Sequence, residues 1–252
     1  MSHQFTSDGL ELVGRLARPD RVGSQGVPAL VLCHGFPTKS NGRLDAGRSY
    51  YDLAERVAED LGWMALAFTY RGCGDSEGNF SLGGWLRDVH TAVAHLDERD
   101  DTDGVWVAGF GTGGALAIVA ASTNDRIKGV AAVSPPADFD DWVADPDGLL
   151  DYARHVGAIR DPDFPDDAQA WKDELATIRA VDAAAALSDR PLLVMHGADD
   201  TVVPVFDARV LADAHGLCDL RIISSAGHRL RFDPRAVAVF LGWLDRVTRR
   251  VA

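Results

Sequence analysis

Short apolar segments that alternate with helical stretches are the feature that most limits how this chain can fold. Apolar segments recur along the whole sequence, at 27–36, 63–70, 105–109, 127–134, 191–197 and 220–227. Amphipathic or small-residue helical patterns follow at 50–62, 85–99, 112–122, 203–216 and 234–250. A strand that is apolar throughout is buried on both faces, and strand–helix alternation places parallel strands between two layers of helices. The sequence therefore predicts an α/β fold with a mostly parallel, doubly wound sheet.

Two segments depart from this alternation. The segment 10–19 alternates as a strand does, and no helix separates it from 27–36, so we expect these two strands to form an antiparallel hairpin at the sheet edge. Residues 139–188 are rich in Asp, Ala, Pro and Trp and are too long for a plain connection. We expect them to form an inserted helical lid of two or three short helices, with 1–138 and 189–252 forming the core.

Composition restricts the partners and the compartment. The net charge of −13 would repel nucleic acid and anionic membrane surfaces, so we expect neither as a partner. No apolar run approaches the ~20 residues that span a bilayer, and the first residues lack the pattern of a signal peptide. Three cysteines are most simply reduced thiols, which favours the cytoplasm. No Cys or His spacing is typical of zinc, and we expect neither a metal nor a cofactor.

Polar and glycine-rich clusters follow four of the predicted strands. They are His34-Gly35-Phe36, the turn Gly109-Phe110-Gly111-Thr112-Gly113, the segment 196–204 with Asp200, and the segment 224–234 with His228. In an open α/β sheet the ligand binds at the carboxyl ends of the strands. These clusters are therefore expected to meet at one edge of the sheet and to form the functional site.

The order of these motifs resembles that of the α/β-hydrolase fold family, over nearly the whole chain. The motifs are HGF (34–36), YRGCGDSEG (70–78), GFGTGG (109–114), GADDTVVP (197–204) and AGHR (226–229). The closest resemblance is to the serine esterases and aminopeptidase-like members with a small helical lid. Although an HG dipeptide is common by chance, the order and the strand-end positions of the five motifs make coincidence an unsatisfactory explanation.

The resemblance assigns roles residue by residue. The triad order of the family, nucleophile, acid and histidine, falls on Gly111, Asp200 and His228. It implies that His228 is the general base and that Asp200 orients its imidazole. It also implies an oxyanion hole made by the backbone N–H groups of Thr112 and Phe36; the neighbouring proline has no N–H to offer.

Gly111 departs from the family pattern, because the nucleophilic serine usually stands at this position. Glycine adopts the strained conformation of such a turn at low cost, but it has no side chain that could attack a substrate. Thr112, Cys33 and Cys73 are alternative nucleophiles, although each of them could equally have a purely structural role. A cysteine would first need a lowered thiol pKa. His34 and His196 each precede a glycine at a strand end and are expected to be structural hydrogen-bond partners.

The lid provides the remaining candidates for the binding pocket. We expect His34, Trp142, Tyr152 and Trp171 to line it, although the lid aromatics could equally serve only to bury the lid against the core. The pocket would take a small molecule with an apolar part. The sequence does not decide whether the chain forms a homodimer.

Three functions fit these residues. The chain could be a relative of the ester and amide hydrolases that retains base, acid and oxyanion hole but lacks the serine. It could be a cofactor-free enzyme that uses the His228–Asp200 dyad to activate water or abstract a proton. It could also be a non-catalytic protein that binds a small ligand. A gain of esterase activity on restoring a serine at Gly111 favours the first, His228-dependent turnover without it favours the second, and binding without turnover favours the third.

Overall fold

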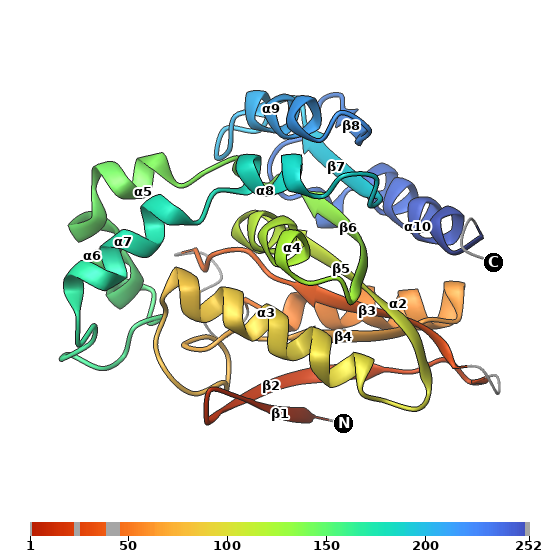
Figure 1. The fold of residues 1–252 in the computed structure, drawn as a ribbon, viewed down its shortest axis with the longest axis horizontal. Helices are drawn as coiled ribbons and strands as arrows, with labels where there is room; N and C mark the ends of the chain where they lie inside the picture. Colours follow the sequence, from red (N-terminus) through yellow and green to blue (C-terminus); the bar gives the residue numbers. More distant parts are fainter. Residues whose placement is uncertain (1, 23–25, 39–45, 250–252) are drawn as a thin grey trace.

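A twisted sheet of eight strands lies between two layers of helices (Figure 1). This computed structural model describes residues 2–22, 26–38 and 46–249. The strands are β1 (His3–Ser7), β2 (Leu10–Ala17), β3 (Val27–Cys33), β4 (Met64–Phe68), β5 (Thr102–Phe110), β6 (Ile127–Val133), β7 (Leu192–Gly197) and β8 (Asp219–Ile223). The α-helices are α2 (Tyr51–Leu61), α3 (Leu82–Asp97), α4 (Thr112–Thr123), α5 (Asp140–Ala144), α6 (Pro146–His155), α7 (Ala168–Thr177), α8 (Ala180–Ala186), α9 (Val205–His215) and α10 (Pro234–Arg249).

The strand order is β1-β2-β4-β3-β5-β6-β7-β8. β1 pairs antiparallel with β2, and β2 pairs antiparallel with β4, whereas every neighbouring pair from β4 to β8 is parallel. The predicted mostly parallel sheet is confirmed. No helix of the described part of the chain has both the length and the apolar character needed to cross a membrane.

The predicted hairpin between 10–19 and 27–36 is wrong. β2 pairs with β1 and β4, and β3 lies in the middle of the sheet between β4 and β5. β3 is apolar on both faces and five of its seven residues are buried, so an interior position is the one that removes both faces from water. The sequence prediction missed β1 because this short strand is largely polar, with only Phe5 and Ser7 buried.

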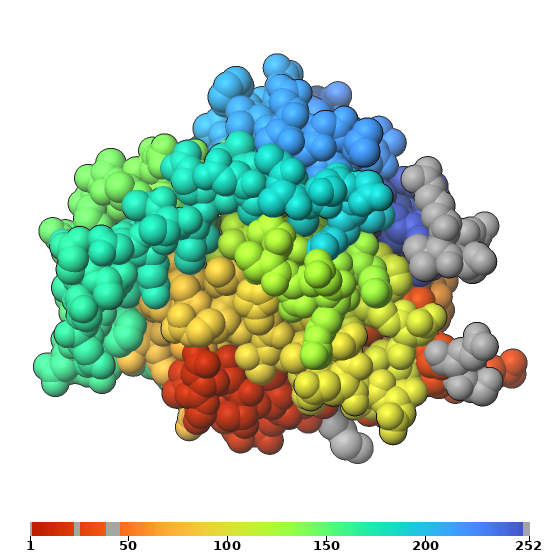
Figure 2. Space-filling view, viewed as in Figure 1, coloured from red at the N-terminus to blue at the C-terminus, as the bar shows by residue number. Residues whose placement is uncertain are grey.

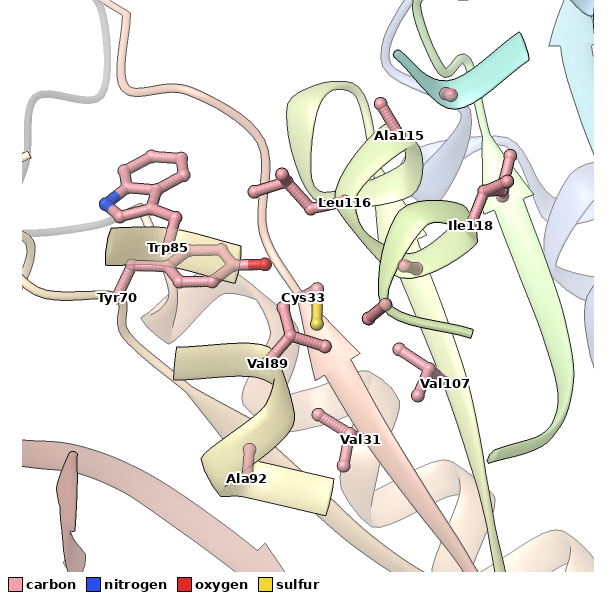
Figure 3. Close-up of a cluster of buried hydrophobic side chains, with 14 of the residues drawn as sticks. Val31, Cys33, Tyr70, Trp85, Val89, Ala92, Val107, Ala115, Leu116 and Ile118 are labelled. Atoms are coloured by element: carbon pink, nitrogen blue, oxygen red, sulfur yellow. The ribbon is translucent and has the colours of Figure 1, made fainter. Parts of the chain in front are cut away.

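Helices cover the two faces of the sheet with separate apolar clusters. On one face, α3, α4 and α9 bury their apolar residues against the strands and α8 packs on α4 and α9, and on the other face α2 and α10 cover the strands. The first cluster includes Tyr70 and Trp85, whose rings stack with centroids 4.3 Å apart beside Cys33 and Val89 (Figure 3). Because Cys33 is the last residue of β3, this packing fixes the strand end from which the first loop of the site begins.

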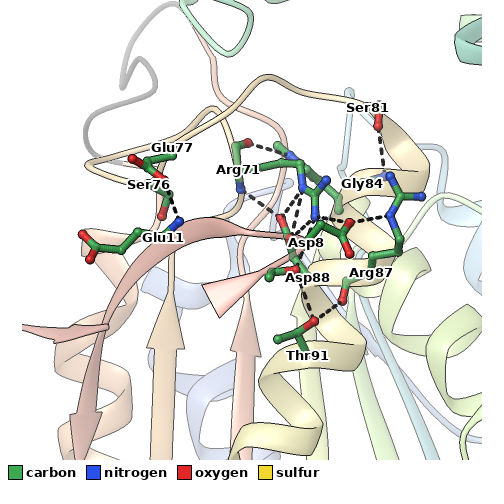
Figure 4. Close-up of polar contacts among 12 residues, drawn as sticks. Asp8, Glu11, Arg71, Ser76, Glu77, Ser81, Gly84, Arg87, Asp88 and Thr91 are labelled. Atoms are coloured by element: carbon green, nitrogen blue, oxygen red, sulfur yellow. Dashed lines mark hydrogen bonds and ion pairs between the residues drawn. The ribbon is translucent and has the colours of Figure 1, made fainter. Parts of the chain in front are cut away.

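A buried ion pair anchors the loop that follows β4. Arg71 donates from its side chain to Asp88 Oδ1 at 2.7 Å and from its backbone N–H to Asp88 Oδ2 at 3.0 Å (Figure 4). It also reaches Asp8, in the turn between β1 and β2, at 3.0 Å. Asp88 is fully buried on α3, and a charge in that position is tolerable only when it is paired and hydrogen-bonded. The pair therefore joins the edge hairpin, the β4 loop and α3.

The segment 139–188 divides into two parts. Helices α5, α6 and α7 stand together at one end of the molecule, apart from the sheet (Figures 1 and 2). α8 instead packs against α4 and α9, as the connecting helix between β6 and β7. The structure thus places the last helix of the predicted insertion among the helices of the core, because the small side chains of Ala180, Ala183 and Ala184 bury closely there.

The glycines on either side of position 111 are needed for close backbone contact. A Cβ on Gly109 would collide with the backbone of Gly113, and a Cβ on Gly113 would collide with the carbonyl of His34. A Cβ on Gly111, by contrast, would have no atom nearer than 3.6 Å. We predict that Gly109→Ala lowers the free energy of unfolding by about 3 kcal/mol or more, because the atoms in the way are backbone and cannot rotate aside.

Gly111→Ala is the matched control for this substitution. It adds only the backbone strain of a positive φ, about 1–2 kcal/mol. Urea unfolding of the two variants measures the difference, and equal losses of stability would contradict the steric argument.

Candidate active site

The turn between β5 and α4 presents Gly111 at its apex. Gly111 has φ 54° and ψ −125°, a backbone conformation that residues other than glycine adopt only under strain. Its N–H donates to the carbonyl of Val133 at 2.9 Å, and its own carbonyl accepts from the N–H of Gly114 at 2.9 Å. These bonds hold the apex at the carboxyl ends of β5 and β6.

Asp200 and His228 come from two other strand ends and meet beside this turn. Asp200 follows β7 and His228 follows β8. Their side chains are joined by a hydrogen bond of 2.9 Å between His228 Nδ1 and Asp200 Oδ2. The carboxylate is fully buried, whereas the imidazole is 30% exposed. Because an ionised carboxylate only accepts, Nδ1 carries a proton in this pair, and in the neutral form of the imidazole the lone pair is on Nε2.

Nε2 of His228 points toward the apex of the turn. A Cβ placed on Gly111 would lie 3.6 Å from Nε2, which would be its nearest neighbour. A hydroxyl oxygen attached to that carbon would therefore be within reach of a hydrogen bond to His228. The structure brings together the three positions that the sequence predicted as nucleophile position, acid and base; their catalytic roles stay predictions.

Hydrogen bonds keep Asp200 ionised. Burial opposes its charge, but hydrogen bonds from His196, His228 and the backbone N–H groups of Val203 and Val202 outweigh this effect and hold its pKa well below the usual range. The two N–H groups donate to Oδ1 at 3.0 and 2.9 Å. An acid that stays charged can fix the imidazole and stabilise its protonated form.

His196 is a second histidine on the same carboxylate. Its ring is fully buried, and its Nε2 lies 3.2 Å from Asp200 Oδ2 and 3.0 Å from the carbonyl oxygen of Val203. The expectation that His196 is a hydrogen-bond partner is confirmed. Its contact with the acid itself was missed, although the four-residue separation between His196 and Asp200 across one turn is a sequence signal for it.

The two predicted oxyanion donors lie next to the apex. Thr112 is the first residue of α4, so its N–H has no acceptor within the helix. On the other side, Cα of Gly35 would lie 3.8 Å from a Cβ on Gly111, which brings the loop that carries Phe36 against the turn. Phe36 and Thr112 both line the cavity above Gly111. Two backbone donors at the wall of this cavity would suit an oxygen that gains negative charge.

A cavity of about 570 Å³ opens above these groups. Its volume is in the range of small-molecule sites. The described residues lining one side are mostly aromatic: Phe36, Phe139, Trp142 and Tyr152. The ring centroid of Phe36 lies 5.3 Å from that of Trp142 and 6.1 Å from that of Tyr152. Trp142 and Tyr152 are thus placed where the sequence predicted them, on a wall suited to an apolar group.

His34 and Trp171 do not line the cavity, which corrects the prediction for both. His34 is buried: its Nε2 accepts the N–H of Tyr70 at 3.2 Å, and its Nδ1 donates to the carbonyl of Gly35 at 2.7 Å. Burial lowers the pKa of His34 to about 4, so its ring is neutral near pH 7 and supports the loop through these hydrogen bonds. Trp171 is buried too, and its Nε1 donates to the carbonyl of Phe80 at 3.2 Å, which ties α7 to the core.

The two cysteines considered as nucleophiles lie away from the cavity. Burial raises the pKa of the Cys33 thiol to about 12, so it carries no thiolate near neutral pH, and Cys73 is fully buried. The described residues that line the cavity include neither a serine nor a cysteine. In the same described part of the chain, His, Cys, Asp and Glu side chains form no group of three that could hold a metal ion.

Strand order, turn and acid–histidine pair together define the class: an α/β protein with the architecture of the α/β-hydrolase fold and a candidate site at the carboxyl ends of its strands. The model of the alpha/beta hydrolase family matches residues 30–240. The chain belongs to this family.

The curated relatives align with this chain over only part of their own length. The quorum-quenching protein AidA of Acinetobacter baumannii is 30% identical over 143 residues, which are 54% of this chain and 43% of AidA. Thiohydrolase aneE of Aspergillus aculeatus is 32% identical over 139 residues, which are 52% of this chain and 40% of aneE. The match therefore spans less than half the length of either relative.

Solved structures match along nearly the whole chain. Est1E from Butyrivibrio proteoclasticus, with ferulic acid bound, has a TM-score of 0.72 at 22% identity, and 98% of each chain is covered. The alpha/beta hydrolase GrgF from Penicillium sp. sh18 has a TM-score of 0.75 at 20% identity, covering 99% of this chain and 98% of that one. At these identities the likeness shows the fold alone.

The lowered pKa of Asp200 predicts how stability depends on pH. Stability from an acid whose pKa is depressed on folding is present above its unfolded value, near 3.8, and is lost as the pH falls below it. We expect Asp200→Asn to be less stable than the unmodified protein at pH 7, by about 2–3 kcal/mol, because the bonds to a buried charge are weakened.

This difference should shrink between pH 4 and pH 2, where the unmodified protein loses the same contribution. Urea unfolding at a series of pH values measures it. A difference that stays constant down to pH 2 would mean that Asp200 is not held in its charged form.

Proposed function

We propose that this chain hydrolyses an ester-type acyl bond, with water rather than a serine as the nucleophile and His228 as the general base. The observation that carries the proposal is the position of His228 Nε2, 3.6 Å from where a Cβ on Gly111 would lie. The base is thus aimed at the place from which the nucleophile attacks in this family, and a water molecule is about the size of the serine hydroxymethyl group that Gly111 lacks.

Each step of the reaction has a residue suited to it. His228 Nε2 takes a proton from water, and the hydroxide adds to the carbonyl carbon of the substrate. Asp200, bonded to Nδ1 at 2.9 Å, stabilises the imidazolium that results. The N–H groups of Thr112 and Phe36 receive the carbonyl oxygen as it becomes an oxyanion. When the intermediate collapses, His228 returns the proton to the leaving oxygen.

The relatives support acyl chemistry and an aromatic acid as one part of the substrate. AneE is named a thiohydrolase, and the Est1E structure contains ferulic acid, an aromatic carboxylic acid. The wall of Phe36, Trp142 and Tyr152 offers an aromatic surface of the same kind here. A bond to oxygen or to sulfur leaves the same carbonyl carbon for water to attack, so the site suits esters and thioesters alike.

The Gly111→Ser variant tests whether the rest of the site is a hydrolase site. We expect it to hydrolyse short p-nitrophenyl esters on the order of 10²-fold faster than the unmodified protein, because its hydroxyl would lie next to an oriented base. Release of p-nitrophenol measures the rate. Gly111→Ala is the control for the added carbon, and a folded Gly111→Ser variant without any gain would argue against a hydrolase-type site.

The unmodified protein tests the water mechanism itself. Its turnover of activated esters should fall by about 10²–10⁴-fold in His228→Ala, the usual contribution of a general base. Turnover that persists in His228→Ala would exclude the proposed role of the dyad. Ligand binding without any turnover, unchanged in His228→Ala, would instead assign the cavity to a non-catalytic binding protein.

A further inference from the structure

Arg231 stands out among the residues that line the cavity. It lies in the short helix Leu230–Phe232, three residues after His228. One of its terminal nitrogens donates to the Tyr50 hydroxyl at 3.4 Å, and its guanidinium carbon lies 5.1 Å from the centre of the Tyr50 ring and 4.3 Å from that of the Phe232 ring. Its Nε is buried and has no hydrogen-bond partner among the described residues. A neutral hydroxyl and two rings thus surround a permanent positive charge.

Comparable arginines in this chain all have a carboxylate. In the described part of the chain, the other arginines that are buried or half-buried are Arg15, Arg71, Arg99, Arg179 and Arg190. Each forms an ion pair: Arg15 with Glu55, Arg71 with Asp88 at 2.7 Å, Arg99 with Asp101 at 2.8 Å, Arg179 with Asp140 at 2.7 Å and Arg190 with Asp125 at 2.9 Å. The chain has 38 acidic residues against 25 basic ones, so acidic partners are plentiful. Arg231 therefore differs from the other half-buried arginines in having no acidic partner among the described residues, and this difference needs an explanation.

Tyr50 does not serve as the missing anion. Burial raises the pKa of its hydroxyl, so it stays neutral and contributes only an acceptor and an aromatic face to Arg231. Among the described residues, three carboxylates line the cavity, and none of them forms an ion pair with Arg231. Asp138 pairs with Arg179 at 3.3 Å, Asp207 accepts the N–H of Ala137 at 3.1 Å, and Asp141 is exposed on α5.

The position of Arg231 relative to the reacting groups follows from its contacts. Tyr50, on which the guanidinium lies, packs against Phe110 with ring centroids 4.7 Å apart, and Phe110 directly precedes Gly111. Arg231, Tyr50 and Phe110 line the cavity together with Gly111 and His228. A cation is therefore present in the wall of the same cavity, and the aromatic residues of α5 and α6 form another part of that wall.

We propose that Arg231 is an anion subsite, which binds a carboxylate group carried by the ligand. The planar guanidinium fits a carboxylate through two parallel hydrogen bonds, and among the described residues only the Tyr50 hydroxyl accepts a hydrogen bond from it. The inference deepens the proposed function: it rests on the same cavity and makes the substrate an acyl compound with a carboxylate besides the bond that is cleaved and with an apolar or aromatic part.

Two compounds of nearly equal shape test the subsite. 3-Phenylpropanoate carries the carboxylate and an aromatic ring, and 3-phenylpropanamide is a neutral compound of nearly the same shape, in which an NH2 group replaces one carboxylate oxygen. We expect calorimetric titration of the unmodified protein at pH 7 to show about 10- to 100-fold tighter binding of the carboxylate, the range that hydrogen bonds to a charged group supply. In Arg231→Gln the preference should fall to about twofold or less.

Two further variants make the result specific. Arg209→Gln removes the same charge from an exposed position on α9, outside the residues that line the cavity, and should keep the preference. Arg231→Lys retains the positive charge without the planar fork and should keep part of it, which covers the case in which Arg231→Gln does not fold.

The inference is overturned if the unmodified protein binds both compounds equally or binds neither. It is also overturned if Arg231→Gln, or a folded Arg231→Lys where the former does not fold, keeps the full preference. Because binding requires no turnover, these outcomes are independent of the esterase assays. A carboxylate preference without a gain in Gly111→Ser would retain the subsite and reject the hydrolase, and a gain without the preference would do the reverse.

Discussion

The close backbone contact between the β5–α4 turn and the end of β3 is the constraint on which the site depends. Neither Gly109 nor Gly113 has room for a Cβ, since the atoms around them belong to the backbone of the turn itself and of Cys33 and His34. This contact lets α4 begin directly at the sheet edge, with its first residue, Thr112, in the lining of the cavity. It also places the loop of Phe36 beside the turn. The same backbone contact therefore positions both expected oxyanion donors, the N–H groups of Phe36 and Thr112.

The second element of the site is electrostatic. Asp200 would be costly to bury as an isolated charge, but it receives two backbone N–H groups and lies against His196 and His228. The end of β7, the loop that follows it and the loop that follows β8 are thereby joined around one carboxylate. The same bonds that keep Asp200 charged also fix the ring of His228, so orientation of the base and stability of the strand ends have one physical source.

Much of this arrangement could be predicted from sequence, because strand ends of a parallel sheet converge whatever lies between them. Gly111, Asp200 and His228 follow apolar strands and come together as expected. The misplaced residues were those whose environment depends on packing rather than on order. His34 also follows a strand, yet its ring turns into the core and packs edge-on against the stacked rings of Tyr70 and Trp85. Tyr50 and Arg231 escaped notice because neither belongs to a motif, and only the fold shows that they touch.

Glycine at position 111 alters the chemistry of the turn without being required by its shape. Unlike Gly109 and Gly113, it has room for a Cβ, and the flanking contacts would hold the turn with a larger residue at the apex. The acid–histidine pair beside it has a structural task on one side only. Asp200 and Nδ1 of His228 join two loops, whereas Nε2 points toward Gly111 and has no hydrogen-bond partner among the described residues. An imidazole nitrogen oriented in this way, in a cavity with an aromatic wall and a cation, supports the proposed role of His228 toward the reacting group of a ligand.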